Sequence, residues 1–108
     1  MHMEIRHYLT ASGVDVFQSW LDGLKDVKAR VAILRRIDRL AERNFGDHKS
    51  LRDGVSEVRV DVGAGYRVYY GKHGKALVLL LCGGSKRTQA VDIARAVGFW
   101  VDYRRRQT

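Results

Sequence analysis

The chain has 108 residues, enough for one compact domain with a single core and too few for a multidomain enzyme. Its hydrophobic fraction of 45%, its charged fraction of 30% and its lack of proline exclude a disordered or fibrous chain. Lysine and arginine number 20 against 12 aspartate and glutamate residues, giving a net charge of +8. We therefore expect a polyanionic partner: RNA, DNA or an acidic protein.

The single cysteine and the four histidines limit the cellular compartment and the metal chemistry that the sequence allows. Cys82 has no partner cysteine, so a disulfide framework is excluded and a reducing compartment is expected. The longest apolar run, residues 76–82, is too short to cross a bilayer, and the first residues do not resemble a signal peptide. The histidines lack the spacing of a metal site. The sequence predicts a cytoplasmic protein with no membrane partner, metal or other cofactor.

The first half of the chain predicts one strand and two helices. Apolar and polar residues alternate from Met3 to Leu9, which is typical of a strand with one buried face. Helical spacing predicts a short helix over residues 14–24 and a long amphipathic helix over residues 26–45, closed by a left-handed Gly46. The basic residues of the long helix are expected to face solvent: Lys28, Arg35, Arg36, Arg39 and Arg43.

The second half predicts a meander of strands. A three-residue loop over residues 63–65 keeps like residues on like faces, pairing Val60 with Val68 and Arg59 with Tyr69. The run LVLLLC predicts a central strand covered on both sides. After it, residues 83–85 are expected to leave the sheet.

A helix is predicted to follow, with Ser85 as its cap. Gly98 is expected to end or bend this helix early. The basic tail over residues 104–108 is expected to be disordered.

Four basic side chains are predicted to gather at one end of the sheet: Arg59, Arg67, Lys86 and Arg87. Such a cluster can bind a phosphodiester and stabilise the charge that builds when a ribose 2′-hydroxyl attacks the phosphorus. In the alternative interpretation, Arg67 pairs with Asp61 across the hairpin, and Arg59 pairs with Glu57 or faces solvent. Three nearby tyrosines are candidates for stacking on RNA bases: Tyr69 is predicted to be exposed, whereas Tyr66 and Tyr70 are predicted to be core.

The segments VSEVRVDVGAGYRVYY and HGKALVLLLCGGSKRTQAVDIARA resemble the RelE/ParE superfamily of bacterial toxins. The resemblance is greatest to the branch called addiction module killer proteins, also described as HigB-like or phage Gp49-like. It covers the chain from about Phe17 to Ala96. It implies a single α+β domain over residues 1–108, in which an N-terminal strand and two helices pack on a mainly antiparallel sheet that is followed by a C-terminal helix.

The resemblance also implies a function. The protein is expected to be the toxin of a type II toxin-antitoxin system, encoded beside a cognate antitoxin and touching operator DNA only through that antitoxin. RelE-like members are endoribonucleases that cut mRNA in the ribosomal A site without a metal. By motif, Arg67 matches the arginine of the family's GYR segment, Arg59 matches a basic residue on the preceding strand, and Lys86 and Arg87 match the basic pair after the last strand.

The sequence departs from RelE at two positions. Ile93 stands where RelE has the tyrosine that serves as general base, and Glu57 stands where RelE has a lysine. Candidates for the base are therefore Asp92, Tyr69 and Tyr103. Two other functions remain open: a ParE-like inhibitor of DNA gyrase, which would not need the four cations, and an inactive relative kept as an antitoxin partner or DNA co-repressor.

Overall fold

The computed structural model describes residues 2–107, which form three α-helices, five strands and one short 3-10 helix. In chain order the elements are β1 (Glu4–His7), α1 (Val16–Gly23), α2 (Val27–Ala41), β2 (His48–Ser50), β3 (Val55–Val60), β4 (Tyr66–His73), β5 (Leu77–Ser85), the 3-10 helix η1 (Lys86–Thr88) and α3 (Gln89–Arg106). The predicted α+β class is confirmed. Within the described residues, no helix combines the length and the hydropathy that a membrane crossing requires.

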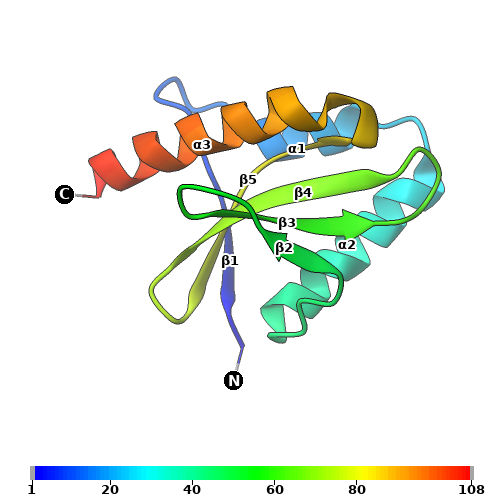
Figure 1. Cartoon of the computed structure of the whole chain (residues 1–108), viewed down its shortest axis with the longest axis horizontal. Helices are drawn as coiled ribbons and strands as arrows, with labels where there is room; N and C mark the ends of the chain where they lie inside the picture. Colours follow the sequence, from blue (N-terminus) through cyan, green and yellow to red (C-terminus); the bar gives the residue numbers. More distant parts are fainter. Residues whose placement is uncertain (1, 108) are drawn as a thin grey trace.

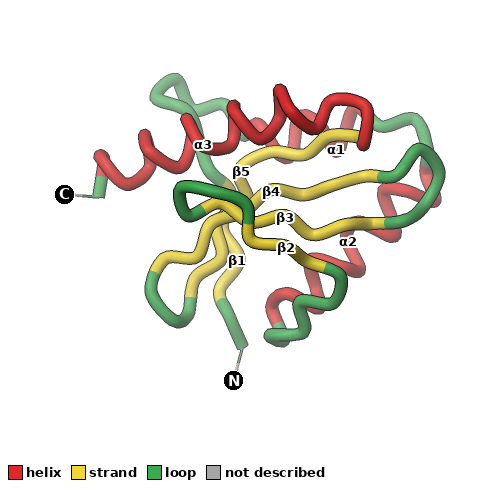
Figure 2. Tube along the Cα trace, in the orientation of Figure 1, coloured by secondary structure: helices red, strands yellow, loops and turns green. Residues whose placement is uncertain are grey.

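The five strands form one sheet in the order β1-β5-β4-β3-β2. β1 runs parallel to β5, and the other neighbouring pairs are antiparallel, as predicted for a mainly antiparallel sheet. Helix α3 crosses one face of the sheet, whereas α1 and α2 lie behind the other (Figure 1). The same layers are visible in the trace of Figure 2. β5 lies inside the sheet between two helical layers, which explains its continuous apolar run.

Each face of the sheet has its own core. Buried residues of α1 and α2 pack on one face with these strand residues: Val58, Val60, Val68, Tyr70, Val78 and Leu80. Ala96 and Trp100 of α3 pack on the other face with Tyr8, Val55, Tyr69, Leu79, Leu81 and Cys82. A register irregularity opposite Tyr69 and Tyr70 places Leu81 and Cys82 together in the core beneath α3. Burial there raises the pKa of the Cys82 thiol to about 12, so the thiol is unreactive at neutral pH.

Helix α2 ends earlier than its apolar pattern predicts. Asp26 caps its start by accepting a hydrogen bond from the Ala29 amide at 3.1 Å. The helix stops at Ala41, because Arg43 takes a left-handed conformation with φ 65°. The amides of Arg43 and Asn44 then close the end on the carbonyls of the last turn. The left-handed closing residue is thus an arginine, and the prediction of Gly46 in that role was wrong.

The hairpin of β3 and β4 has a longer loop than predicted. Val60 pairs with Tyr66 and Arg59 with Arg67, so residues 61–65 form a five-residue loop that contains Asp61. The prediction of a three-residue loop was wrong by two residues of register. Because the shift is even, every side chain still lies on its predicted face.

The structure also corrects three predictions near the C-terminus. Residues 83–85 do not leave the sheet, because they form the last part of β5. Helix α3 continues through Gly98 and includes Arg104, Arg105 and Arg106, which were expected to be disordered. Arg106 holds the end of the helix by donating to the Asp102 carboxylate at 2.7 Å and to the Leu9 carbonyl at 2.5 Å. Residue 108 of the predicted tail lies outside the described residues.

Adjacent glycines near the end of β5 let two helices approach the sheet from opposite sides. A Cβ on Gly83 would overlap the Trp20 ring of α1, and one on Gly84 would overlap the Asp92 carboxylate of α3. Trp20 is packed against the core, so it has little room to move. The two glycines therefore set how closely α1 and α3 dock.

We expect Gly83→Ala to lower the free energy of unfolding by about 1–3 kcal/mol, because the added methyl group overpacks the Trp20 contact. Gly98→Ala is the matched control. Nothing lies near its Cβ position, so alanine in mid-helix should raise stability by up to about 1 kcal/mol. Urea denaturation of both variants measures the two effects, and equal changes would contradict the close docking of α1.

Candidate functional site

A buried carboxylate joins two arginines on the face of the sheet that α3 partly covers. The side chain of Glu57 is 0% exposed, and its Oε2 accepts a hydrogen bond from Nε of Arg59 at 2.7 Å. Nε of Arg67 lies 3.4 Å from the same oxygen. The two arginine side chains are 38% and 11% exposed, so Arg59 faces solvent and Arg67 lies beneath the surface.

Strand periodicity and register produce this arrangement. Glu57 and Arg59 are two residues apart on β3 and therefore share a face. Arg67 of β4 lies directly opposite Arg59, and Glu57 is its diagonal neighbour. Two like charges placed opposite each other repel, and the shared carboxylate offsets that repulsion. The alternative pairing of Arg59 with Glu57 is thus confirmed, whereas Arg67 pairs with Glu57 and not with Asp61.

Two further side chains hold this group, and neither role was predicted from the sequence. Nε2 of Gln89, the first residue of α3, donates to Oε1 of Glu57 at 3.1 Å. Arg36 of α2 donates to the Arg59 carbonyl at 2.7 Å and also bonds the carbonyls of residues 45 and 47. Burial lowers the pKa of Arg36, which was predicted to face solvent. For Gln89, the only indication in the sequence was a polar residue at the start of a helix. Nothing in the sequence indicated the role of Arg36.

Lys86 and Arg87 stand at the same end of the sheet as the two arginines. They open η1 directly after β5, and both are exposed. The Lys86 amide donates to the Gly65 carbonyl at 2.8 Å, which fixes η1 against the β3–β4 loop. Because Arg67 pairs with Gly84, Lys86 follows only two residues after the partner of Arg67. The four predicted cations therefore share one end of the sheet. Two of them, Arg59 and Arg67, also share the Glu57 carboxylate.

Tyr69 is buried, and its prediction as an exposed side chain was wrong. Alternation along β4 places it under α3, which strand periodicity alone does not reveal. Its hydroxyl has no hydrogen-bond partner among the described residues. Burial, followed by the nearby charges of Glu57 and Asp92, raises the pKa of this hydroxyl, so the phenolate form is strongly disfavoured. Tyr69 cannot act as a general base, because a substrate cannot reach it and its hydroxyl stays protonated.

The other two base candidates have structural contacts. Asp92 is buried in the first turn of α3, where it accepts from the Thr88 hydroxyl and lies 3.5 Å from Arg95. A carboxylate at this position is favoured by the helix dipole. Tyr103 lies three turns further along α3 and therefore away from the arginine pair. Its hydroxyl bonds Nδ1 of His73 at 2.9 Å.

The exposed part of the site is a cationic surface without a prepared base. Arg59, Lys86 and Arg87 are accessible and can contact the oxygens of a phosphate group. Within residues 2–107, no group of three or more histidine, cysteine, aspartate or glutamate side chains is placed to hold a metal ion. The three accessible cations can bind an anion and stabilise developing negative charge.

Comparison with known proteins identifies a relative but not an activity. The sequence matches none of the protein-family profiles with which it was compared. A protein of Haemophilus influenzae (strain ATCC 51907 / DSM 11121 / KW20 / Rd), described as uncharacterized, is 52% identical to this chain over 80 residues. The match covers 74% of this chain and 81% of the relative. The chain therefore belongs to the same family as that protein.

Proposed function

We propose that the protein is the toxin of a type II toxin-antitoxin system, with a RelE-like fold and the activity of an mRNA endonuclease in the cytoplasm. The observation that carries this proposal is the pair of arginines that face each other across β3 and β4, next to Lys86 and Arg87. The GYRVYY and GGSKRTQ segments that supply these cations are also those in which the sequence resembles the toxin superfamily. A cognate antitoxin would be its protein partner.

The same side chains suggest how cleavage would proceed. Attack of a ribose 2′-hydroxyl on the adjacent phosphorus would form a 2′,3′-cyclic phosphate and break the bond to the 5′-oxygen of the next nucleotide, with water taking the 2′ proton and protonating the leaving oxygen. Extra negative charge builds on the phosphate oxygens in this step, and Arg59, Lys86 and Arg87 can stabilise that charge. Glu57, Tyr69 and Asp92 are all buried, so none of them can reach the 2′-hydroxyl proton. Catalysis must then rely on charge stabilisation and on alignment of the 2′-oxygen with the phosphorus. The ribosomal A site would supply this alignment.

The expected result is rapid cleavage of mRNA on programmed ribosomes and weak or no cleavage of the same mRNA free in solution. Purified protein is incubated with both substrates, and primer extension maps the cuts. Heat-denatured protein serves as the control for contaminating nucleases. Equal cutting of both substrates would contradict ribosome dependence.

One observation favours a second candidate function. Glu57 partly neutralises the arginine pair, and the site offers no accessible base, which are properties of a binding surface more than of an enzyme. The alternative is therefore a ParE-like inhibitor of DNA gyrase. Inhibition of gyrase supercoiling by the purified protein, with no cleavage on ribosomes, would select this alternative. Activity in neither assay would favour an inactive antitoxin-binding relative.

A further inference from the structure

A basic cavity lies at the far end of β4 from the arginine pair. Arg67 is the second residue of β4, whereas Lys72 and His73 at its other end line a cavity of 810 Å³. The cavity exists because β4 is longer than its neighbour: β3 begins at Val55, opposite Gly71, so the last two residues of β4 pair only with β5. The space beside them is bounded by β2, the turn before β3 and the end of α3.

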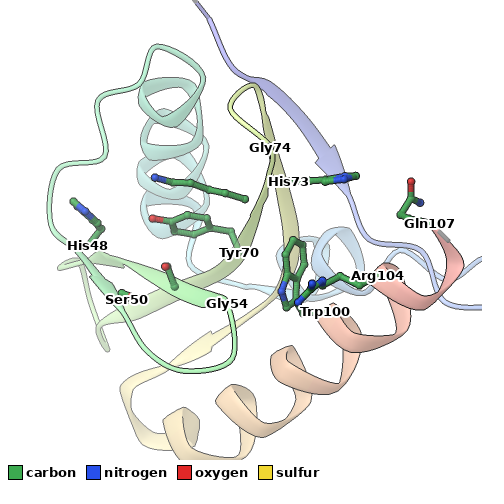
Figure 3. Close-up of a pocket in the computed structure, with 11 residues that line it drawn as sticks. His48, Ser50, Gly54, Tyr70, His73, Gly74, Trp100, Arg104 and Gln107 are labelled. Carbon is green, nitrogen blue, oxygen red and sulfur yellow. The ribbon is translucent and has the colours of Figure 1, made fainter.

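The lining of this cavity is basic and contains no carboxylate. Four basic side chains from β2, β4 and α3 line it: His48, Lys72, His73 and Arg104. Figure 3 shows His48 and Ser50 on one side of the cavity, with His73, Arg104 and Gln107 on the other. The Ser50 and Ser56 side chains add hydroxyl groups that can donate hydrogen bonds. Basic residues therefore line the space on opposite walls.

Two buried aromatic side chains form the floor of the cavity. Trp100 and Tyr70 are buried and lie between the two basic walls (Figure 3). The Trp100 ring packs against Gly71 and Gly54, where a Cβ would lie 2.5 Å from its atoms. Its Nε1 has no hydrogen-bond partner within the described part of the chain. This nitrogen is buried against Gly54, so the tryptophan shapes the floor of the cavity and is not counted among the donors to a ligand.

We propose that this cavity binds a phosphate group, carried by RNA or by a small phosphorylated molecule. Lysine, arginine and hydroxyl donors are the side chains that hold phosphate oxygens, and a wall without carboxylates raises the local concentration of anions. A volume of 810 Å³ lies within the range of small-molecule sites, so there is room for a nucleotide as well as for its phosphate. The site is separate from the arginine pair, and it does not depend on the proposed cleavage activity.

The two tryptophans allow binding at each end of the sheet to be followed separately. Trp100 lines the proposed site, whereas Trp20 packs on Gly83 near the arginine end. Their indole N–H signals are followed by NMR while the protein is titrated with inorganic phosphate, with adenosine monophosphate and with a short single-stranded RNA. We expect a saturable shift of the Trp100 signal with at least one probe. The tightest probe identifies the source of the phosphate.

Charge-reversal variants test the assigned side chains. Lys72→Glu and Arg104→Glu should each weaken the binding seen at Trp100 by about tenfold or more, because each places an anion in the cavity wall. Lys28→Glu, on an exposed position of α2 away from the cavity, is the matched control for net charge and should leave the affinity within about twofold. An unchanged dispersion of the NMR spectrum verifies that each variant is folded.

Three results would overturn the proposal: no saturable shift of the Trp100 signal with any probe, saturable shifts confined to Trp20, or an equal loss of affinity in Lys28→Glu. The readout is binding and not cleavage. A negative result in the ribosome assay therefore does not affect the binding test. A negative result in the binding test likewise does not contradict the proposed cleavage activity.

Discussion

Replacing Glu57 with alanine is expected to lower the free energy of unfolding by about 3 kcal/mol. The side chain is fully buried, and it is the shared partner of Arg59, Arg67 and Gln89. Its removal leaves two guanidinium groups opposite each other in register with no intervening anion, and it opens a cavity under the first turn of α3. Chemical denaturation followed by circular dichroism measures the loss.

Two other variants separate charge from volume in this result. Glu57→Gln keeps the shape and the acceptor oxygen but removes the charge, so it should lose less stability than alanine. Glu4→Ala removes a carboxylate that is 54% exposed and paired with Arg6, and it should cost less than about 1 kcal/mol. A Glu57→Ala protein as stable as Glu4→Ala would show that the buried carboxylate does not hold the arginine pair.

The second large effect concerns activity. Arg67→Ala should reduce mRNA cleavage on programmed ribosomes by about 10²-fold or more, because it removes a preorganised cation beside Arg59, Lys86 and Arg87, which are proposed to contact the scissile phosphate. Glu57 keeps Arg59 and Gln89 as partners in this variant, so the fold should persist. Single-turnover cleavage rates measure the effect, and the unfolding transition verifies the fold.

Arg52→Ala is the matched control, since it removes the same charge from an exposed arginine whose partner is Asp53. Its cleavage rate should stay within about threefold of the parent protein, because the contribution of a surface ion pair is small. A folded Arg67→Ala protein that cuts as fast as Arg52→Ala would remove Arg67 from the proposed site.

The alternation of residues predicted the faces of the sheet correctly, but it could not predict the exact pairing. Arg59 and Arg67 lie on the same face in the predicted and the observed registers, because the two registers differ by two residues. The length of the loop depends on its own backbone conformation, with Gly63 and Gly65 at positive φ, and no hydrophobic pattern encodes that. β2 was not predicted, because its three residues are all exposed and carry no apolar signal.

The candidate site was predicted as a set of cations and not as a network. Charged residues are rarely fully buried, so nothing along the sequence indicated that Glu57 would be. Its burial depends on α3 crossing the face and supplying Gln89, which is a tertiary contact between residues 32 positions apart. The same helix covers Tyr69, and for the same reason its burial could not be predicted from strand periodicity.

The parallel pairing of β1 with β5 has a consequence for the order of folding. Ile5 pairs with Val78, so the two partners are separated by 78 − 5 = 73 positions along the chain. Strands β3, β4 and β5 are joined by short loops and can pair locally, whereas closing so long a loop costs more chain entropy. On a chain that is still being synthesised, β1 has no partner until β5 has been made. The local meander can therefore form first, and the N-terminal strand completes the sheet last.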